Sequence, residues 1–228
     1  MKMNKIIKIS LVLTLGLMFV ISTTLLVSAH TTSQSSVLKS EYMPEYGDYY
    51  VGGESVGWSI DEDYHSGFPY MFFKWRSSDA CLTTARKNIF LQGANKWAPC
   101  GTIEYDPTGN SYFGALGTFD PGPGSSTVAQ FYDYSSDSDG HLLFWRIDMN
   151  WRVSATSTDI AHEFGHAFGL NDLYNISNSN KLMYGYTSGT ATGPTSTDVK
   201  GFNVITGLHS SHSFNTSGVC IVCGGLKK

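Results

Sequence analysis

The chain has 228 residues, of which 41% are hydrophobic and 14% aromatic. This is enough apolar material for one well-buried core but not for two full domains, so a single domain is expected. Acidic residues outnumber basic ones by 19 to 15, a net charge of −4 that becomes more negative once the basic first residues are removed, which argues against nucleic acid as a partner.

The first 29 residues have the composition of a secretory signal peptide. Three lysines precede an apolar run over residues 9–27, and Ala29 closes a small-residue cleavage site. We predict cleavage after Ala29 and a secreted, extracellular protein with 12 basic (15 minus 3) and 19 acidic residues, a net charge of −7. An uncleaved membrane anchor is the alternative, because the run is just long enough to span a bilayer. No second apolar run follows, so no membrane contact is expected after cleavage.

The rest of the chain divides into a leader and one domain. Residues 30–57 are rich in Ser, Thr, Gly and Tyr, which indicates a flexible leader or a short propiece. The domain covers residues 58–228 and ends in a short tail that contains cysteines. Its pattern predicts, in chain order, a strand over 68–78, a helix over 79–97 capped by Ser78 and ended by Pro99, strands over 101–107, 127–132 and 142–149, and a second helix from about 158.

The second helix carries side chains at metal-ligand spacing. His162 and His166 are four residues apart and share one helix face, so both imidazoles can bind one ion. Glu163 follows the first of them, where its carboxylate lies beside the ion and can act as a general base. Gly169 can adopt a positive φ and end the helix, and the chain then returns Asp172 as a third ligand. Three protein ligands with one open position are typical of a catalytic zinc site.

The stretch HExxHxxGxxD over residues 162–172, followed by Met183 in the segment LMYGY, resembles the active site of the metzincin zinc endopeptidases. In that clan a Met-turn lies beneath the metal. The segments FDPGPGSSTVAQFY, RIDMNW and STDVKGFNVITG are similar to the matrixins in particular, so the likeness covers about residues 68–207. The resemblance implies a zincin-like α+β fold with a twisted, mostly parallel sheet, an antiparallel edge strand, an active-site helix and a Met-turn.

Three features depart from the matrixin pattern. Asp172 stands in place of the third His, as in the snapalysin-type branch, and a carboxylate is still a suitable zinc ligand. Gln130 stands where the matrixin edge strand has a His for a second, structural zinc, so only one zinc ion is expected. No Cys precedes Cys81, so the cysteine that caps the metal in matrixin precursors is absent.

The resemblance implies a monomeric zinc endopeptidase in which Glu163 takes a proton from the attacking water and passes it to the leaving amine. A protein or peptide substrate would bind as an added antiparallel strand along the edge strand. The edge residues expected to bind it are Thr127, Val128, Ala129 and Gln130. The residues expected to shape the pocket beside the scissile bond are Tyr184, Gly185 and Tyr186. Tyr186 could also donate a hydrogen bond to the oxyanion, or these tyrosines could only pack under the turn.

Two other classes of protein fit parts of this pattern. A catalytically inactive, zinc-stabilised secreted binding protein, such as an adhesin or an inhibitor, would keep the three ligands and cleave nothing. A metal-free surface protein would use the helix only for packing, with Phe164 and Phe168 as its buried face. The presence of Glu163 argues against the first class, and the joint presence of Gly169, Asp172 and Met183 argues against the second.

Acidic residues before and within the last predicted strand suggest calcium as a second cation. They are Asp133, Asp137, Asp139 and Asp148. Carboxylates beside a glycine suit Ca²⁺, but the twelve-residue spacing and the closing Glu of an EF-hand are missing. A structural calcium and a solvated acidic turn therefore both stay open. The histidines outside the motif, His141, His209 and His212, are assigned no metal.

The chain has four cysteines, Cys81, Cys100, Cys220 and Cys223, which an oxidising compartment would allow to pair. A straight helix over 79–97, at about 1.5 Å per residue, would place Cys81 roughly 25 Å from the helix end. Cys81 could then reach Cys100 only if the helix broke at Gly93. The pair Cys220 and Cys223 meets no such obstacle, and a redox role for this CxxC lacks the usual βαβ context.

Overall fold

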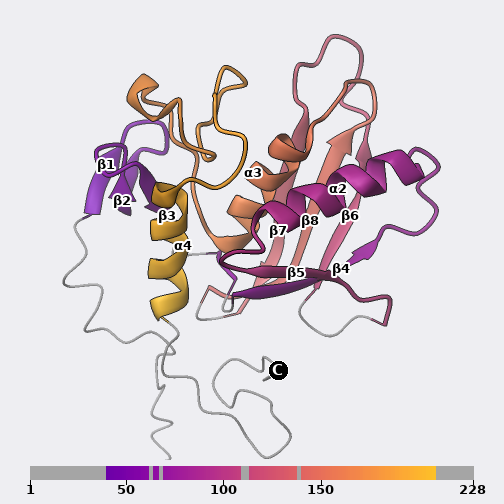
Figure 1. The fold of residues 1–228 in the computed structure, drawn as a ribbon, viewed down its shortest axis with the longest axis horizontal. Helices are drawn as coiled ribbons and strands as arrows, with labels where there is room; N and C mark the ends of the chain where they lie inside the picture. The colour runs from indigo at the N-terminus through magenta and orange to yellow at the C-terminus, as the bar shows by residue number, and fades with distance from the viewer. Residues whose placement is uncertain (1–39, 62–63, 67–68, 109–112, 138–139, 209–228) are drawn as a thin grey trace, which may run out of the picture.

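A computed structural model describes residues 40–61, 64–66, 69–108, 113–137 and 140–208 (Figure 1). The predicted signal peptide and the cysteine-containing tail lie outside these ranges. Within them the fold is mixed α/β, with a five-stranded sheet, a three-stranded sheet and three α-helices. In these same ranges, no helix combines the length and the apolar character needed to cross a bilayer.

The larger sheet has the strand order β5-β4-β6-β8-β7. Its strands are β4 (Tyr70–Trp75), β5 (Thr102–Tyr105), β6 (Phe113–Phe119), β7 (Ala129–Ser136) and β8 (Leu142–Asn150). Neighbouring strands from β5 to β8 pair in parallel, whereas β7 pairs antiparallel with β8 at one edge. The mostly parallel sheet predicted from the sequence is thus confirmed.

Strand β6 lies in the middle of this sheet, where the sequence pattern predicts no strand. Its segment FGALGTF contains two glycines, which weaken any strand pattern. The glycines serve close packing: a Cβ on Gly114 would lie 2.3 Å from the indole of Trp145 on β8. Tertiary contact rather than β-propensity therefore places this strand.

Helices α2 (Thr84–Lys96) and α3 (Ser157–Phe168) lie in front of the larger sheet in Figure 1 and pack against each other. A Cβ on Gly93 of α2 would lie 2.6 Å from Cγ2 of Ile160 on α3, so a glycine is needed at this contact. The fully buried Trp97 donates a hydrogen bond from Nε1 to the carbonyl oxygen of Ala161 at 2.8 Å. These contacts fix α3 against the core.

The start of α2 differs from the predicted one. The helix begins at Thr84 with Thr83 as its N-cap, so the prediction that Ser78 caps it is wrong. Ser78 has a positive φ of 62°, and Asp79 accepts hydrogen bonds from the Thr118 amide at 2.6 Å and the Cys81 amide at 3.1 Å, which hold this stretch in a turn. The helix runs unbroken through Gly93, and within the described ranges Cys81 and Cys100 are both free thiols.

An antiparallel three-stranded sheet precedes these elements. It consists of β1 (Ser40–Met43), β2 (Asp48–Gly53) and β3 (Trp58–Ile60). Residues 40–57 belong to the segment predicted as a flexible leader or a short propiece, and they hold two of these strands. Whether the segment is a propiece stays a prediction. Aromatic side chains supply part of the apolar contacts of these strands, such as the Tyr42 and Tyr49 rings 5.3 Å apart, and the sequence shows no aliphatic alternation there.

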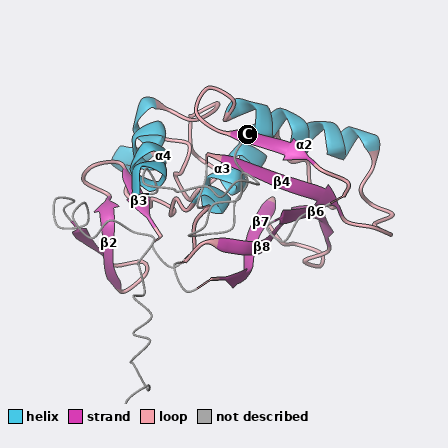
Figure 2. Cartoon of the chain, turned by 90° about the horizontal axis from the view of Figure 1, so that it is seen from below, coloured by secondary structure: helices cyan, strands magenta, loops and turns pink. Residues whose placement is uncertain are grey.

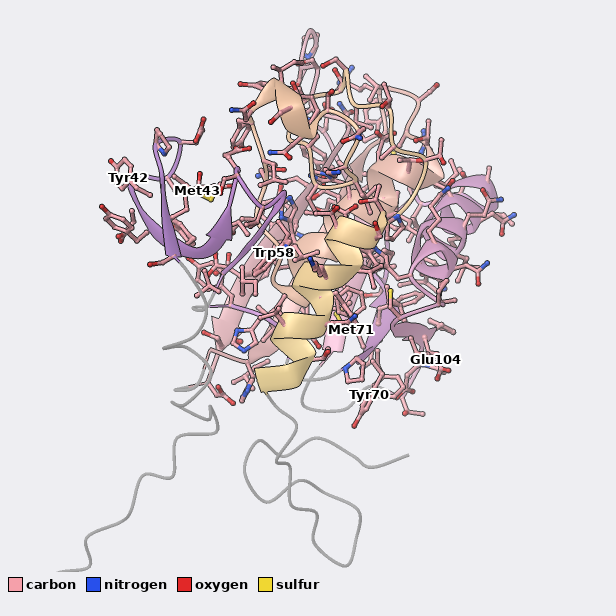
Figure 3. All side chains as sticks on the ribbon, turned by 60° about the vertical axis from the view of Figure 1, so that its left-hand side comes forward. Tyr42, Met43, Trp58, Tyr70, Met71 and Glu104 are labelled. Atoms are coloured by element: carbon pink, nitrogen blue, oxygen red, sulfur yellow. The ribbon has the colours of Figure 1, made fainter. Side chains whose placement is uncertain are left out.

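The small sheet packs on helix α4 (Ser196–Leu208) through β3. A Cβ on Gly201 would lie 3.0 Å from Cβ of Trp58, and Figure 3 shows Trp58 beside α4. The same view places Tyr42 on the outer side of the sheet. Figure 2 shows α4 between the small sheet and α3. The N-terminal sheet is thus joined to the helical side of the molecule.

Candidate metal centre

Helix α3 positions the predicted metal-binding side chains. Thr156 caps it, with its amide donating to the Asp159 carboxylate at 2.7 Å in a capping box. The buried face of the helix consists of Ile160, Ala161, Phe164, Gly165, Ala167 and Phe168. His162, Glu163 and His166 remain partly exposed. Gly169 ends the helix in the left-handed region at φ 109°, as the sequence predicts.

Three side chains converge at one point beside this helix. Nε2 of His162 lies 3.1 Å from Nε2 of His166 and 2.9 Å from Oδ1 of Asp172. Nε2 of His166 lies 3.6 Å from the same carboxylate oxygen. The ligand atoms lie within 4.8 Å of one another, and among the described residues no other group of three or more His, Cys, Asp or Glu side chains converges in this way. The structure thus brings the three predicted ligands together.

Backbone carbonyl groups set the tautomer of both histidines. Nδ1 of His162 donates to the carbonyl oxygen of Leu182 at 2.8 Å, and Nδ1 of His166 donates to that of Leu170 at 2.8 Å. Because a carbonyl oxygen can only accept, each Nδ1 carries a proton and each neutral imidazole directs the lone pair of Nε2 to the common point. This is the arrangement that orients a histidine toward a metal.

The charges at this point favour a cation. Burial alone would lower the pKa of His162, but the Asp172 carboxylate outweighs it and raises that pKa to about 9. Burial raises the pKa of Asp172, yet His166 and His162 together hold it well below its usual range. Two lone pairs and a carboxylate repel one another unless a proton or a cation lies between them. A set of two nitrogens and one oxygen suits zinc, so the residues present fit the predicted ion.

A buried aspartate that the sequence analysis did not single out supports this site. Asp198, fully buried at the start of α4, accepts hydrogen bonds from the Leu182 amide at 3.1 Å and the Met183 amide at 3.2 Å. The Leu182 carbonyl in turn holds His162. Asp198 therefore acts on His162 through the turn at 181–184. The segment TSTD, which ends at Asp198, has the spacing of a capping box and was the available signal.

Glu163 lies between the ligands and the edge strand. Burial raises the pKa of its carboxyl group, while the neighbouring His166 and His162 and a hydrogen bond from the Phe131 amide lower it; the net shift is upward. The Phe131 ring also lies 6.1 Å from the His166 ring. Strand β7 thus runs directly beside the candidate base.

A cleft of about 680 Å³ contains this group. The predicted substrate-binding residues all line it: Thr127, Val128, Ala129, Gln130, Tyr184, Gly185 and Tyr186. Tyr186 is 54% exposed, and its ring contacts Tyr174 and Tyr184 with centroids 5.4 Å apart in each case. The hydroxyl of Tyr174 donates to Oδ2 of Asp172 at 3.0 Å. The roles of these residues in binding a substrate stay predictions.

Two of the aspartates considered for calcium have other partners. Asp148 is fully buried and pairs with Arg76 at 3.1 Å and Arg146 at 3.0 Å. Asp137 lies 2.9 Å from Nδ1 of His141. Asp139 is outside the described residues. Calcium therefore stays a prediction, and Asp148 forms ion pairs with the two arginines instead.

Comparisons with known proteins add little to this geometry. No family model matches the chain, and no curated protein matches its sequence. Among solved structures it is similar to high choriolytic enzyme 1, a hatching enzyme zinc-protease from Oryzias latipes (medaka fish), with 13% identity and a TM-score of 0.42, over 64% of this chain and 94% of that chain. A likeness this distant does not identify a family, so the proposals below rest on the site itself.

Proposed function

We propose that the protein is a secreted, metzincin-like zinc endopeptidase with Glu163 as its general base. The observation that carries the proposal is the convergence of the His162, His166 and Asp172 ligand atoms within 4.8 Å. Glu163 and an edge strand line the same cleft, so the candidate base and a place for an extended peptide lie beside the ligand set.

His162, His166 and Asp172 would hold the zinc ion, which would act as a Lewis acid on the scissile carbonyl and on the attacking water. Glu163 takes the proton of the attacking water and passes it to the leaving amine. Burial, which raises the pKa of its carboxyl group, favours this exchange because a general base works best with a pKa near the operating pH. The Phe131 amide orients the carboxylate through its hydrogen bond.

Strand β7 provides the means to hold a peptide. The carbonyl oxygen of Val128 accepts a hydrogen bond from the Asn150 amide at 2.9 Å, so Val128 faces β8. Neighbouring residues in an antiparallel strand alternate in direction, and the backbone groups of Ala129 and Phe131 therefore point to the cleft side. The bond between Phe131 and Glu163 agrees with this direction. A substrate would add to this edge as an antiparallel strand.

The test is cleavage of an unfolded protein by the purified protein, with and without a zinc chelator. We expect cleavage that the chelator stops and added zinc restores. Glu163→Ala should abolish cleavage and keep the zinc, because it removes the base and leaves all three ligands. Glu45→Ala, a matched change at an exposed glutamate between β1 and β2, should cleave as the parent does. Zinc-loaded protein that cleaves nothing would instead favour the inactive binding protein.

A further inference from the structure

The N-terminal sheet contacts the chain immediately before Asp172. Strand β3 and the residue after it pair with residues 169–171: the Asp61 amide donates to the Gly169 carbonyl at 2.8 Å, and the Asn171 amide donates to the Ser59 carbonyl at 3.0 Å. The side chain of Asn171 also donates to Oγ of Ser59 at 3.2 Å. The segment that leads from α3 to the third ligand is therefore paired with β3.

The same sheet also contacts the chain immediately after Asp172. Glu54, in the turn between β2 and β3, accepts a hydrogen bond from the Tyr174 amide at 2.5 Å through Oε1. Its Oε2 accepts from the Asn175 amide at 3.1 Å and from Nδ2 of the buried Asn178 at 2.6 Å. One carboxylate thus satisfies three N–H donors of the loop that follows the ligand.

The turn that carries Glu54 is itself well fixed. The carbonyl oxygen of Gly53 accepts hydrogen bonds from the Val56 amide at 3.3 Å and the Gly57 amide at 3.1 Å. Glu41 on β1 accepts from the amide of Ser55 at 3.1 Å and from its hydroxyl at 2.5 Å. A Cβ on Gly53 would lie 2.5 Å from Cβ of Glu41, so the glycine lets β1 approach the turn. The position of Glu54 is therefore fixed by contacts within the N-terminal sheet as well as by the loop.

We propose that the N-terminal sheet, residues 40–60, positions the third metal ligand, Asp172, and that Glu54 is the main positioning residue. The proposal rests on the same metal site as the proposed function. Asp172 lies in a loop, and a loop ligand binds a metal tightly only when its backbone is already ordered. The chain before Asp172, residues 169–171, and the chain after it, residues 174–178, are both held by hydrogen bonds to this sheet and its turns. Tyr46, between β1 and β2, also lines the cleft, and its hydroxyl lies 3.5 Å from the carbonyl oxygen of Asp172.

This assignment has a direct consequence for processing. A propiece removed up to residue 57 would take away β1, β2 and Glu54, and with them the anchor that follows Asp172. The sheet must therefore remain in the mature protein. N-terminal sequencing of the secreted, zinc-loaded protein should find a chain that begins at or before residue 40, and a chain that begins after residue 57 would overturn the proposal.

The decisive variant is Glu54→Gln in protein expressed from the full sequence. The glutamine keeps the size of the side chain but places an NH₂ group opposite N–H donors. Competition with a chromogenic zinc chelator should show zinc affinity about 10-fold to 100-fold weaker, the usual effect of losing a group that orients a ligand. Glu45→Gln, which makes the same charge change at an exposed position of the same sheet, should leave the affinity unchanged.

Two readouts, kcat at excess zinc and KM, distinguish a role of Glu54 in zinc binding from a general role in stability. Excess zinc should restore kcat of Glu54→Gln with an unchanged KM, because Glu54 does not line the cleft. Should Glu54→Gln not fold, Asn178→Ala removes one donor of the same contact and should weaken zinc binding in the same direction. Zinc affinity equal to the parent in a folded Glu54 or Asn178 variant would overturn the proposal. Chelator competition needs no cleavage, so a protein that binds zinc but cleaves nothing would refute the proposed function alone.

Discussion

Gly165 of α3 and Met183 of the following turn lie so close that a Cβ on the glycine would be 2.3 Å from the methionine Sδ. Gly165 lies one residue before His166 in the helix, and Met183 follows Leu182, whose carbonyl holds His162. The close approach of these two residues therefore sets the distance between the helix and the turn that orients its first histidine.

Gly165→Ala should lower the melting temperature, because the added methyl group has no space. Overpacking of this kind costs about 1–3 kcal/mol of unfolding free energy. Gly207→Ala is the matched control: nothing lies within 4 Å of a Cβ there, and alanine in a helix is favoured over glycine by about 1 kcal/mol. Thermal denaturation of both variants checks this, and equal melting temperatures would contradict the packing described here.

Asp198→Asn should lower both the stability of the folded protein and its affinity for zinc. The substitution places an NH₂ group where Asp198 now accepts hydrogen bonds from the Leu182 and Met183 amides, and a buried donor without a partner costs about 1–3 kcal/mol. The disturbed turn should release His162 and lower zinc affinity. Asp120→Asn, at an exposed carboxylate paired with Arg152, should change neither quantity. Parent-like zinc affinity in folded Asp198→Asn would argue against this role.

Ala129→Pro should impair substrate binding and leave the metal in place. Proline removes the N–H that points to the cleft side, and an edge strand tolerates proline where the N–H is not paired to a neighbouring strand. We expect KM for an unfolded protein or peptide to rise several-fold while zinc content stays at the parent level. Ala129→Ser keeps the N–H and should behave as the parent; a matching rise in KM for both variants would mean that the side chain, not the backbone, matters.

The Asp79 carboxylate should make the stability of the folded protein fall at low pH. Burial alone would raise its pKa, but hydrogen bonds from Thr118 and the nearby Arg76 guanidinium lower it overall. A folded-state pKa below the unfolded value of about 3.9 means that the charged carboxylate stabilises the fold above about pH 4. That stabilisation is lost as the pH falls through the folded pKa. The melting temperature of Asp79→Asn should therefore lie below that of the parent at pH 7, and the gap should narrow toward pH 3. A gap of constant size would contradict this.

The helix and its ligand spacing could be predicted because they depend on local geometry. His162 and His166 share a face in any α-helix, and Gly169 ends α3 in the left-handed region as the sequence suggests. The helix-capping threonine of α2 and the strand β6 were missed, because both depend on contacts between segments far apart in sequence. These are the contact of Asp79 with Thr118, 39 residues away, and the contact of Gly114 with Trp145. Sequence periodicity carries no information about such contacts.

The support of the third ligand was beyond sequence reasoning for the same reason. Glu54 and Tyr174 are 120 residues apart in the chain. Nothing near either residue marks the contact, and the short aromatic strands β1 and β2 lack the aliphatic alternation that would have indicated a sheet. Only the three-dimensional arrangement shows that a segment resembling a leader holds the loop of Asp172.

The central claim is that His162, His166 and Asp172 bind one zinc ion, and X-ray absorption at the zinc edge of the purified protein tests it most directly. The account predicts one zinc per chain, with two imidazole nitrogens at about 2.0–2.1 Å and carboxylate oxygen at about 2.0–2.2 Å. Asp172→Ala should lose most of this zinc. Sulfur ligands at about 2.3 Å, which would point to the cysteines, or full zinc content in Asp172→Ala, would contradict the account.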